Sequence, residues 1–100
     1  MGAKRAGCAA LLLGALLLVP GCARHGREVF VREGCGDCHR FRDVGGGGAP
    51  VLDGIASRRD AGSIRAQITN PGAGSTASRM PAFRRLSWYD LHSLVAFLRT

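Results

Sequence analysis

The stretch Cys35-Gly36-Asp37-Cys38-His39 decides the fold of this chain. It is a C-x-x-C-H string, which is typical of proteins that attach a haem covalently. Two thiols three positions apart can each form a thioether with one vinyl group on the same edge of a porphyrin. The histidine that follows then lies under the ring, where its imidazole can bind the iron as the proximal ligand. The string therefore predicts one covalently bound haem, held by Cys35 and Cys38, with His39 as an iron ligand.

Three other interpretations of the string are weaker. A zinc site would use Cys35, Cys38 and His39, but structural zinc normally needs a second ligand pair. Outside the string the chain offers only His25 and His92, which are far apart and unpaired, and we expect His25 to be a solvated linker residue. A thioredoxin-like dithiol expects a βαβ context, which this short glycine-rich chain does not supply. A structural disulfide between the two cysteines is favoured least.

The second axial position of the iron is predicted to be filled by Met80. It is the only methionine other than the initiator, and it lies in a loop far enough from His39 for the chain to return on the opposite side of the ring. A soft thioether ligand favours the ferrous state and so raises the reduction potential. The remaining alternatives for this position are His25, His92 or an open site.

Residues 1–21 are predicted to be an export signal of the lipoprotein type. After a basic start, residues 6–19 form an uninterrupted run of apolar and small residues. This run is shorter than the roughly 20 residues that a membrane span requires. It ends in the string Val19-Pro20-Gly21-Cys22, which resembles a bacterial lipobox. In such a motif the cysteine, here Cys22, is lipidated and becomes the new N-terminus.

Ordinary signal cleavage and an uncleaved anchor remain as alternatives to lipidation. Covalent haem attachment and cysteine lipidation both take place outside the cytoplasm, so the two cysteine motifs agree on location. We therefore expect a protein that is anchored by lipid to the periplasmic side of a bacterial membrane. Residues 22–26 would be a short tether, whose four residues after the cysteine span at most about 14 Å. Residues 27–100 would form the folded domain.

Length and charge limit the remaining possibilities. One hundred residues make at most one domain. The chain has 14 lysine and arginine residues against 7 acidic ones, a formal charge of +7, which suits docking on acidic protein faces or an anionic surface. Nucleic acid is not an expected partner, because the chain carries an export signal and no run of basic residues interleaved with aromatics.

Local patterns predict where helices begin and end. The predicted elements are a short helix over Arg27–Glu33, a loop over Arg40–Gly48, a helix over 61–69, an irregular loop over 70–79 and a final helix after Ser87. Asp60 and Ser87 are the expected N-caps, with Asp90 completing a capping box. Four consecutive glycines, Gly45–Gly48, are expected to exclude helix and strand and to let the backbone pass close to something flat and large.

Together these segments resemble a class I cytochrome c of the short bacterial kind. The resemblance runs from Gly26 to the C-terminus. It is carried by Gly26-Arg27-Glu28-Val29-Phe30, Cys35-Gly36-Asp37-Cys38-His39, Gly48-Ala49-Pro50, Met80-Pro81-Ala82-Phe83 and the helix from Leu91 to Leu98.

The resemblance implies an all-α fold of three to four helices around one haem. It also implies that the carbonyl of Pro50 accepts a hydrogen bond from the ring of His39, which would fix the tautomer and tune the iron. The first and last helices would cross through Gly26, Phe30, Leu94 and Phe97. No residue matches the propionate-binding aromatic of the family with confidence, and Trp88 is a weak candidate.

The predicted function is that of a membrane-tethered monohaem cytochrome, which passes single electrons between redox partner proteins with acidic docking faces. An iron with both axial positions filled has no place for a small-molecule substrate, so we expect an electron carrier and not an enzyme. One alternative is a haem-based redox or gas sensor, which would require Met80 to be labile. Another is a cytochrome subunit that works only inside a larger oxidoreductase.

Overall fold

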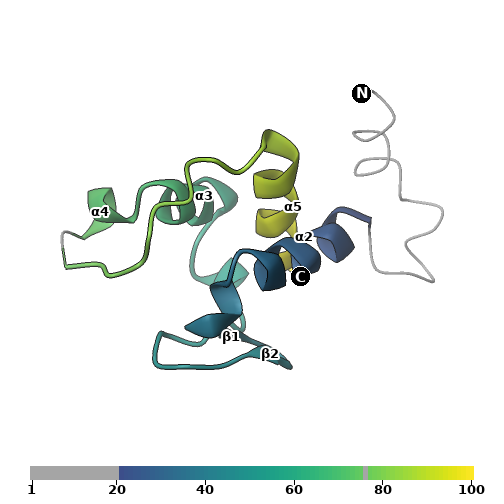
Figure 1. Cartoon of the computed structure of the whole chain (residues 1–100), viewed down its shortest axis with the longest axis horizontal. Helices are drawn as coiled ribbons and strands as arrows, with labels where there is room; N and C mark the ends of the chain where they lie inside the picture. The colour runs from purple at the N-terminus through teal and green to yellow at the C-terminus, as the bar shows by residue number, and fades with distance from the viewer. Residues whose placement is uncertain (1–20, 76) are drawn as a thin grey trace.

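The computed structural model describes residues 21–75 and 77–100, and this part of the chain is mainly helical (Figure 1). The helices are α2 (Gly21–Arg32), α3 (Ala61–Thr69), α4 (Pro71–Gly74) and α5 (Trp88–Leu98), with 3-10 turns at Cys35–Asp37 and Ile55–Ser57. Two short antiparallel strands, β1 (Arg40–Phe41) and β2 (Val44–Gly45), form a hairpin. The predicted all-α fold of a few helices is confirmed.

The predicted export signal lies almost wholly outside the described residues, because it comprises residues 1–21. Within the described part of the chain, no helix is both long and apolar enough to cross a membrane.

Helices α2 and α5 cross at the centre of the domain, and a glycine allows them to approach closely (Figure 1). Gly26 of α2 is buried, and a Cβ at this position would overlap the carbonyl oxygen of Ser93 and lie 2.6 Å from Cβ of Phe97. Phe30, one turn further along α2, meets Phe97 edge-on with 5.7 Å between the ring centroids. The crossing therefore uses the glycine and the aromatic residues that the family resemblance implies.

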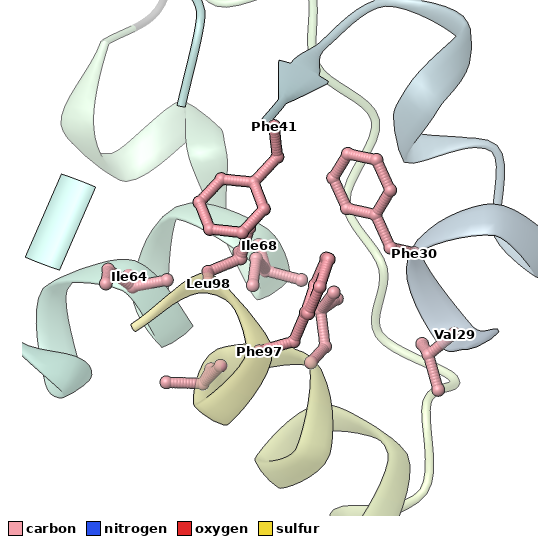
Figure 2. Packing of buried hydrophobic residues seen from close by; sticks show 9 residues of the cluster. Val29, Phe30, Phe41, Ile64, Ile68, Phe97 and Leu98 are labelled. Atoms are coloured by element: carbon pink, nitrogen blue, oxygen red, sulfur yellow. The ribbon is translucent and has the colours of Figure 1, made fainter. Parts of the chain in front are cut away.

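Three phenylalanine rings form the centre of the core (Figure 2). Phe41 of β1 meets Phe97 edge-on at 4.9 Å, as Phe30 does from the other side, and edge-to-face contact is a favourable arrangement for aromatic rings. The buried cluster is completed by aliphatic side chains, namely Val29, Ile64, Ile68, Leu94, Val95 and Leu98. Because these residues come from α2, α3 and α5, the cluster holds α3 and the hairpin against the helix crossing.

Helix α2 begins at Gly21, not at Arg27 as predicted. Residues 22–26 are therefore helical, where the sequence suggested a short extended tether. Cys22 and Ala23 are buried in the first turn of this helix. The buried face of α2 thus continues through these residues to Gly26, which lies against Ser93 and Phe97 of α5.

His25 was expected to be a solvated linker residue, and the structure places it at the contact between α2 and α5 instead. Its Nε2 donates to Oδ1 of Asp90 at 2.7 Å, and its ring stacks on Tyr89 at 4.6 Å. Arg32, the last residue of α2, donates to the other oxygen of Asp90 at 2.8 Å. The hydrogen bonds from His25 and Arg32 hold the pKa of Asp90 below its usual range. The carboxylate of Asp90 thus connects His25 and Arg32 of α2 to the first turn of α5.

The N-cap residues of α3 and α5 are confirmed, whereas the carboxylate of Asp90, expected to complete a capping box, accepts from His25 and Arg32 instead. Oδ1 of Asp60 accepts from the amide of Ser63 at 2.7 Å, and Oγ of Ser87 accepts from the amide of Asp90 at 3.0 Å. Each bond satisfies an amide that has no partner within its own helix. The boundaries of α3 and the start of α5 are therefore those that the local sequence predicts.

The segment after α3 was predicted to be irregular, yet it contains the short helix α4. Asn70 leaves the helical conformation, with φ of −149° and ψ of 65°, as expected for a residue that precedes proline. Pro71 then starts a new helical turn, because its fixed φ suits the first position of a helix and its missing N–H would have no partner there.

Candidate haem-attachment site

The C-x-x-C-H string forms one tight turn directly after α2. Gly34 precedes it with a φ of 78°, a conformation that glycine adopts without steric cost. The amides of Cys38 and His39 then both donate to the carbonyl of Cys35, at 3.3 and 2.9 Å. In a 3-10 turn the residues i and i+3 lie above one another. The turn therefore places the side chains of Cys35 and Cys38 on the same side of the backbone.

The two cysteines of the string differ in burial. Cys35 and Cys38 are free cysteines; Cys35 is partly buried and Cys38 is exposed. Burial raises the pKa of the Cys35 thiol to about 11, and the charge of Glu33 adds to this shift. A thiol with so high a pKa stays protonated at neutral pH and is slow to oxidise. Cys35 and Cys38 are therefore not joined to each other in a thioredoxin-like disulfide.

The ring of His39 is oriented by the segment that follows the hairpin. Its Nδ1 lies 2.7 Å from the carbonyl oxygen of Pro50, to which it donates a hydrogen bond. Two backbone bonds hold this segment in place, from Ala49 N to Cys38 O at 3.0 Å and from Leu52 N to Arg40 O at 2.8 Å. A proton held on Nδ1 leaves the lone pair on Nε2, which is the arrangement that metal-binding histidines use.

The glycine-rich segment packs against the attachment string, backbone on backbone. Gly45 lies in β2, so the prediction that the glycines exclude strand is wrong at this position. A Cβ on Gly45 would overlap His39 O and lie 2.8 Å from the Cα of Gly36, and one on Gly47 would lie 2.9 Å from the Cα of Cys38. The close neighbour of these two glycines is therefore the backbone of the string itself.

Met80 lies in the loop between α4 and α5, partly buried against the hydrophobic core. Its sulfur accepts a hydrogen bond from Nε2 of Gln67 on α3, at 3.8 Å. The amide of Phe83 donates to the carbonyl of Ile68 at 2.9 Å and so fastens the same loop to α3. Gln67 could not be predicted from the sequence, because no local pattern reveals a contact between a side chain on a helix and a methionine in a distant loop.

The residues around the core fit a large apolar group that carries carboxylates. Apolar side chains that contact the core but stay partly exposed are Cys35, Val44, Leu52, Ile55, Ala61, Met80, Phe83, Leu86 and Leu91. Cys35 belongs to the attachment string, and Phe83 follows Met80 in the same loop. Burying the exposed apolar surface of these side chains under a ligand would be energetically favourable. Arg65 has a buried Nε with no hydrogen-bond partner in the described structure, which suits a carboxylate. These features match a haem, with its flat ring and two propionates.

The zinc interpretation has no geometric support within residues 21–75 and 77–100. No group of three histidine, cysteine or acidic side chains comes together there in a way that could hold a metal ion.

A small helical domain with a C-x-x-C-H turn, an oriented histidine and a methionine packed on the same core defines a covalent haem protein. A family model described as Cytochrome c matches residues 23–100, and the chain belongs to this family, as a class I member. Neither the curated proteins nor the solved structures gave a match. The chain is therefore a haem-based electron-transfer protein that carries covalent haem c and exchanges electrons with redox partner proteins.

Proposed function

We propose that this cytochrome carries single electrons as a lipid-anchored protein on the periplasmic side of a bacterial membrane. Cys35 and Cys38 form the thioethers, and His39 and Met80 are the axial ligands. The observation that carries the proposal is the 2.7 Å hydrogen bond from His39 Nδ1 to the carbonyl of Pro50. It fixes the imidazole with Nε2 available to iron, and such outer contacts set the orientation and basicity of a metal ligand.

The surroundings of Met80 support its role as the second ligand. A thioether that only faced solvent would have no fixed position. The Met80 side chain is instead partly buried, and its sulfur accepts a hydrogen bond from Gln67. Its amide also donates to Oγ of Ser78 at 3.3 Å, which limits the loop that carries it. The bound haem supplies a one-electron couple. With both axial positions filled, the protein is an electron carrier and neither an enzyme nor a gas sensor.

Replacing Met80 by alanine is expected to leave the haem attached and to open the sixth coordination position. The ferrous protein should then bind carbon monoxide, and the reduction potential should fall because the thioether that favours ferrous iron is gone. Optical spectra and a redox titration measure both effects. Met80→His is the matched control, which should stay six-coordinate at a lowered potential. An unchanged spectrum and potential in Met80→Ala would show that the ligand assignment is wrong.

Exposed arginines around the methionine loop support docking on acidic partners. Arg79 precedes Met80, and Arg84 and Arg85 follow Phe83, and all three arginines are exposed. Positive charge next to the redox centre speeds the encounter with a negatively charged surface, and interfaces of redox proteins are typically small and short-lived. The partners we propose therefore carry acidic docking faces.

The lipid anchor is proposed from the string Val19-Pro20-Gly21-Cys22. A lipidated N-terminal cysteine carries several acyl chains, which is enough for stable membrane attachment. Helix α2 begins at Gly21 and packs on α5, so the anchor would lead directly into the folded domain.

Mass spectrometry of the N-terminal peptide tests this anchor. We expect an acylated Cys22 followed by Ala23 in protein taken from membranes. The matched control is Cys22→Ser, whose N-terminal peptide should carry no acyl chain. An unmodified N-terminus at another position in the native protein would refute lipidation. An N-terminus produced by ordinary signal cleavage would make the electron carrier soluble, and the assignment of Met80 would be unaffected.

A further inference from the structure

Helix α2 has one side packed into the domain and one side turned to solvent. The residues on its inner side are buried, namely Cys22, Ala23, Gly26, Val29 and Phe30. On the other side the helix exposes Arg24, Arg27, Glu28 and Val31. Residues three, four and seven positions apart lie on one side of an α-helix, so these side chains form a single stripe. We call these four residues the outer face of α2.

The outer face carries positive charge that the fold does not use. Arg27 is exposed, and its guanidinium takes part in none of the ion pairs within residues 21–75 and 77–100. Arg24, one turn earlier, adds a second positive charge to the same face. The acidic member, Glu28, has its carboxylate 3.5 Å from the ring of His25 on the same helix. The face therefore offers arginine to a negatively charged partner.

Val31 adds an apolar side chain to the outer face. It retains 61% of its accessible surface, more than Val51 or Trp88, the other large apolar residues exposed in the described part of the chain. It lies four residues after Arg27, so the two side chains are neighbours on the helix. Helices that lie on membranes combine basic and apolar side chains, because the basic groups pair with phosphates while the apolar groups enter the layer beneath.

The outer face also lies next to the proposed lipid anchor. Helix α2 begins at Gly21, so Cys22 belongs to its first turn and Arg24 follows two residues later. With a rise of 1.5 Å per residue, Val31 is only about 14 Å from Cys22 along the helix axis. A lipid on Cys22 therefore keeps the whole outer face within reach of the bilayer.

We propose that the outer face of α2 binds the anionic phospholipid headgroups of the membrane that holds the lipid anchor. Arg24 and Arg27 pair with phosphates, and Val31 enters the boundary below them. A lipid alone allows a domain to turn about its anchor, so this second contact fixes which side of the domain faces the bilayer. The attachment string follows α2 directly, so the contact keeps the haem near the membrane surface. The inference rests on the proposed function, because it requires the anchor at Cys22.

Chemical modification of arginine tests the contact in the native holoprotein on vesicles. One set of vesicles contains phosphatidylglycerol and phosphatidylcholine, the other phosphatidylcholine only, and both accept a lipid anchor. The protein is treated with phenylglyoxal, and mass spectrometry gives the extent of reaction at each arginine. Arg24 and Arg27 should react more slowly on the anionic vesicles than on the neutral ones. Arg59, which is exposed in the segment before α3, is the internal control and should react equally on both.

Reversing one charge of the outer face should abolish this protection. In Arg27→Glu the equilibrium constant for contact should fall about thirtyfold, because the change removes an attractive charge near the membrane surface and adds a repulsive one. Arg24 should then react alike on both kinds of vesicle. Arg59→Glu is the matched control, since it changes the net charge equally, and it should leave Arg24 protected. Equal reaction of Arg24 and Arg27 on the two kinds of vesicle, or equal protection of Arg59, would overturn the proposal.

Failure of the contact is distinguishable from failure of the anchor. Mass spectrometry of the N-terminal peptide reports on the lipid independently of the arginines. A native protein without acyl chains contradicts the anchor and this inference together. An acylated protein whose arginines react alike on both kinds of vesicle contradicts only the contact through α2.

Discussion

Replacing Gly26 by alanine is expected to lower the free energy of unfolding by about 3 kcal/mol or more, because overpacking a tight contact costs 1–3 kcal/mol and occasionally more. The new Cβ would overlap the carbonyl oxygen of Ser93 and lie 2.6 Å from the Cβ of Phe97. Neither neighbour is the free end of a flexible side chain, so α2 and α5 have to separate. A domain of this size has only about 5–15 kcal/mol of stability in total.

Chemical denaturation of the purified holoprotein measures this cost. Gly62→Ala is the matched control, because it lies in α3, where the nearest atom to a new Cβ is Oδ1 of Asp60 at 3.6 Å. This control should be neutral or slightly stabilising, since alanine is favoured over glycine in helices by up to about 1 kcal/mol. If both variants unfold at the same denaturant concentration as the native protein, the close crossing at Gly26 is wrong.

Replacing Gly47 or Gly45 by alanine is expected to reduce the amount of covalently attached haem and the stability of the remainder. A non-glycine residue at φ of 111° or 83° costs about 1–3 kcal/mol in backbone strain alone. In addition, the methyl group would displace the backbone of Cys38 or of Gly36, and the geometry of the attachment turn depends on both. The thiols and the ring of His39 would then be presented in the wrong relative positions.

Haem content per chain, followed by thermal unfolding, measures this effect, and Gly46→Ala is its matched control. A Cβ on Gly46 meets nothing within 4 Å, so this variant should retain native haem content and melting temperature. The same result for Gly47→Ala would mean that the glycine-rich segment does not position the attachment string. Equal losses in all three variants would point to the flexibility of the loop and not to contact with the string.

Residues close together in the sequence determined much of this protein without help from the fold. The C-x-x-C-H string predicts the attachment turn, because hydrogen bonds within five residues close it. Asp60 and Ser87 mark the starts of α3 and α5 for the same reason, since each caps an amide three residues away. The resemblance to the family further predicted the hydrogen bond between His39 and Pro50 and the helix crossing at Gly26.

The tertiary structure alone decided the features that join distant segments. Helix α2 extends back to Gly21 with Cys22 and Ala23 buried, and His25 leaves solvent because Asp90 lies opposite it. Gln67 meets the sulfur of Met80 only once α3 and the methionine loop are packed on one core. Local patterns report on helix periods, caps and turns, whereas these contacts depend on how the chain folds back on itself. The same holds for the glycines, because identical residues from 45 to 48 have different roles depending on which backbone passes beside them.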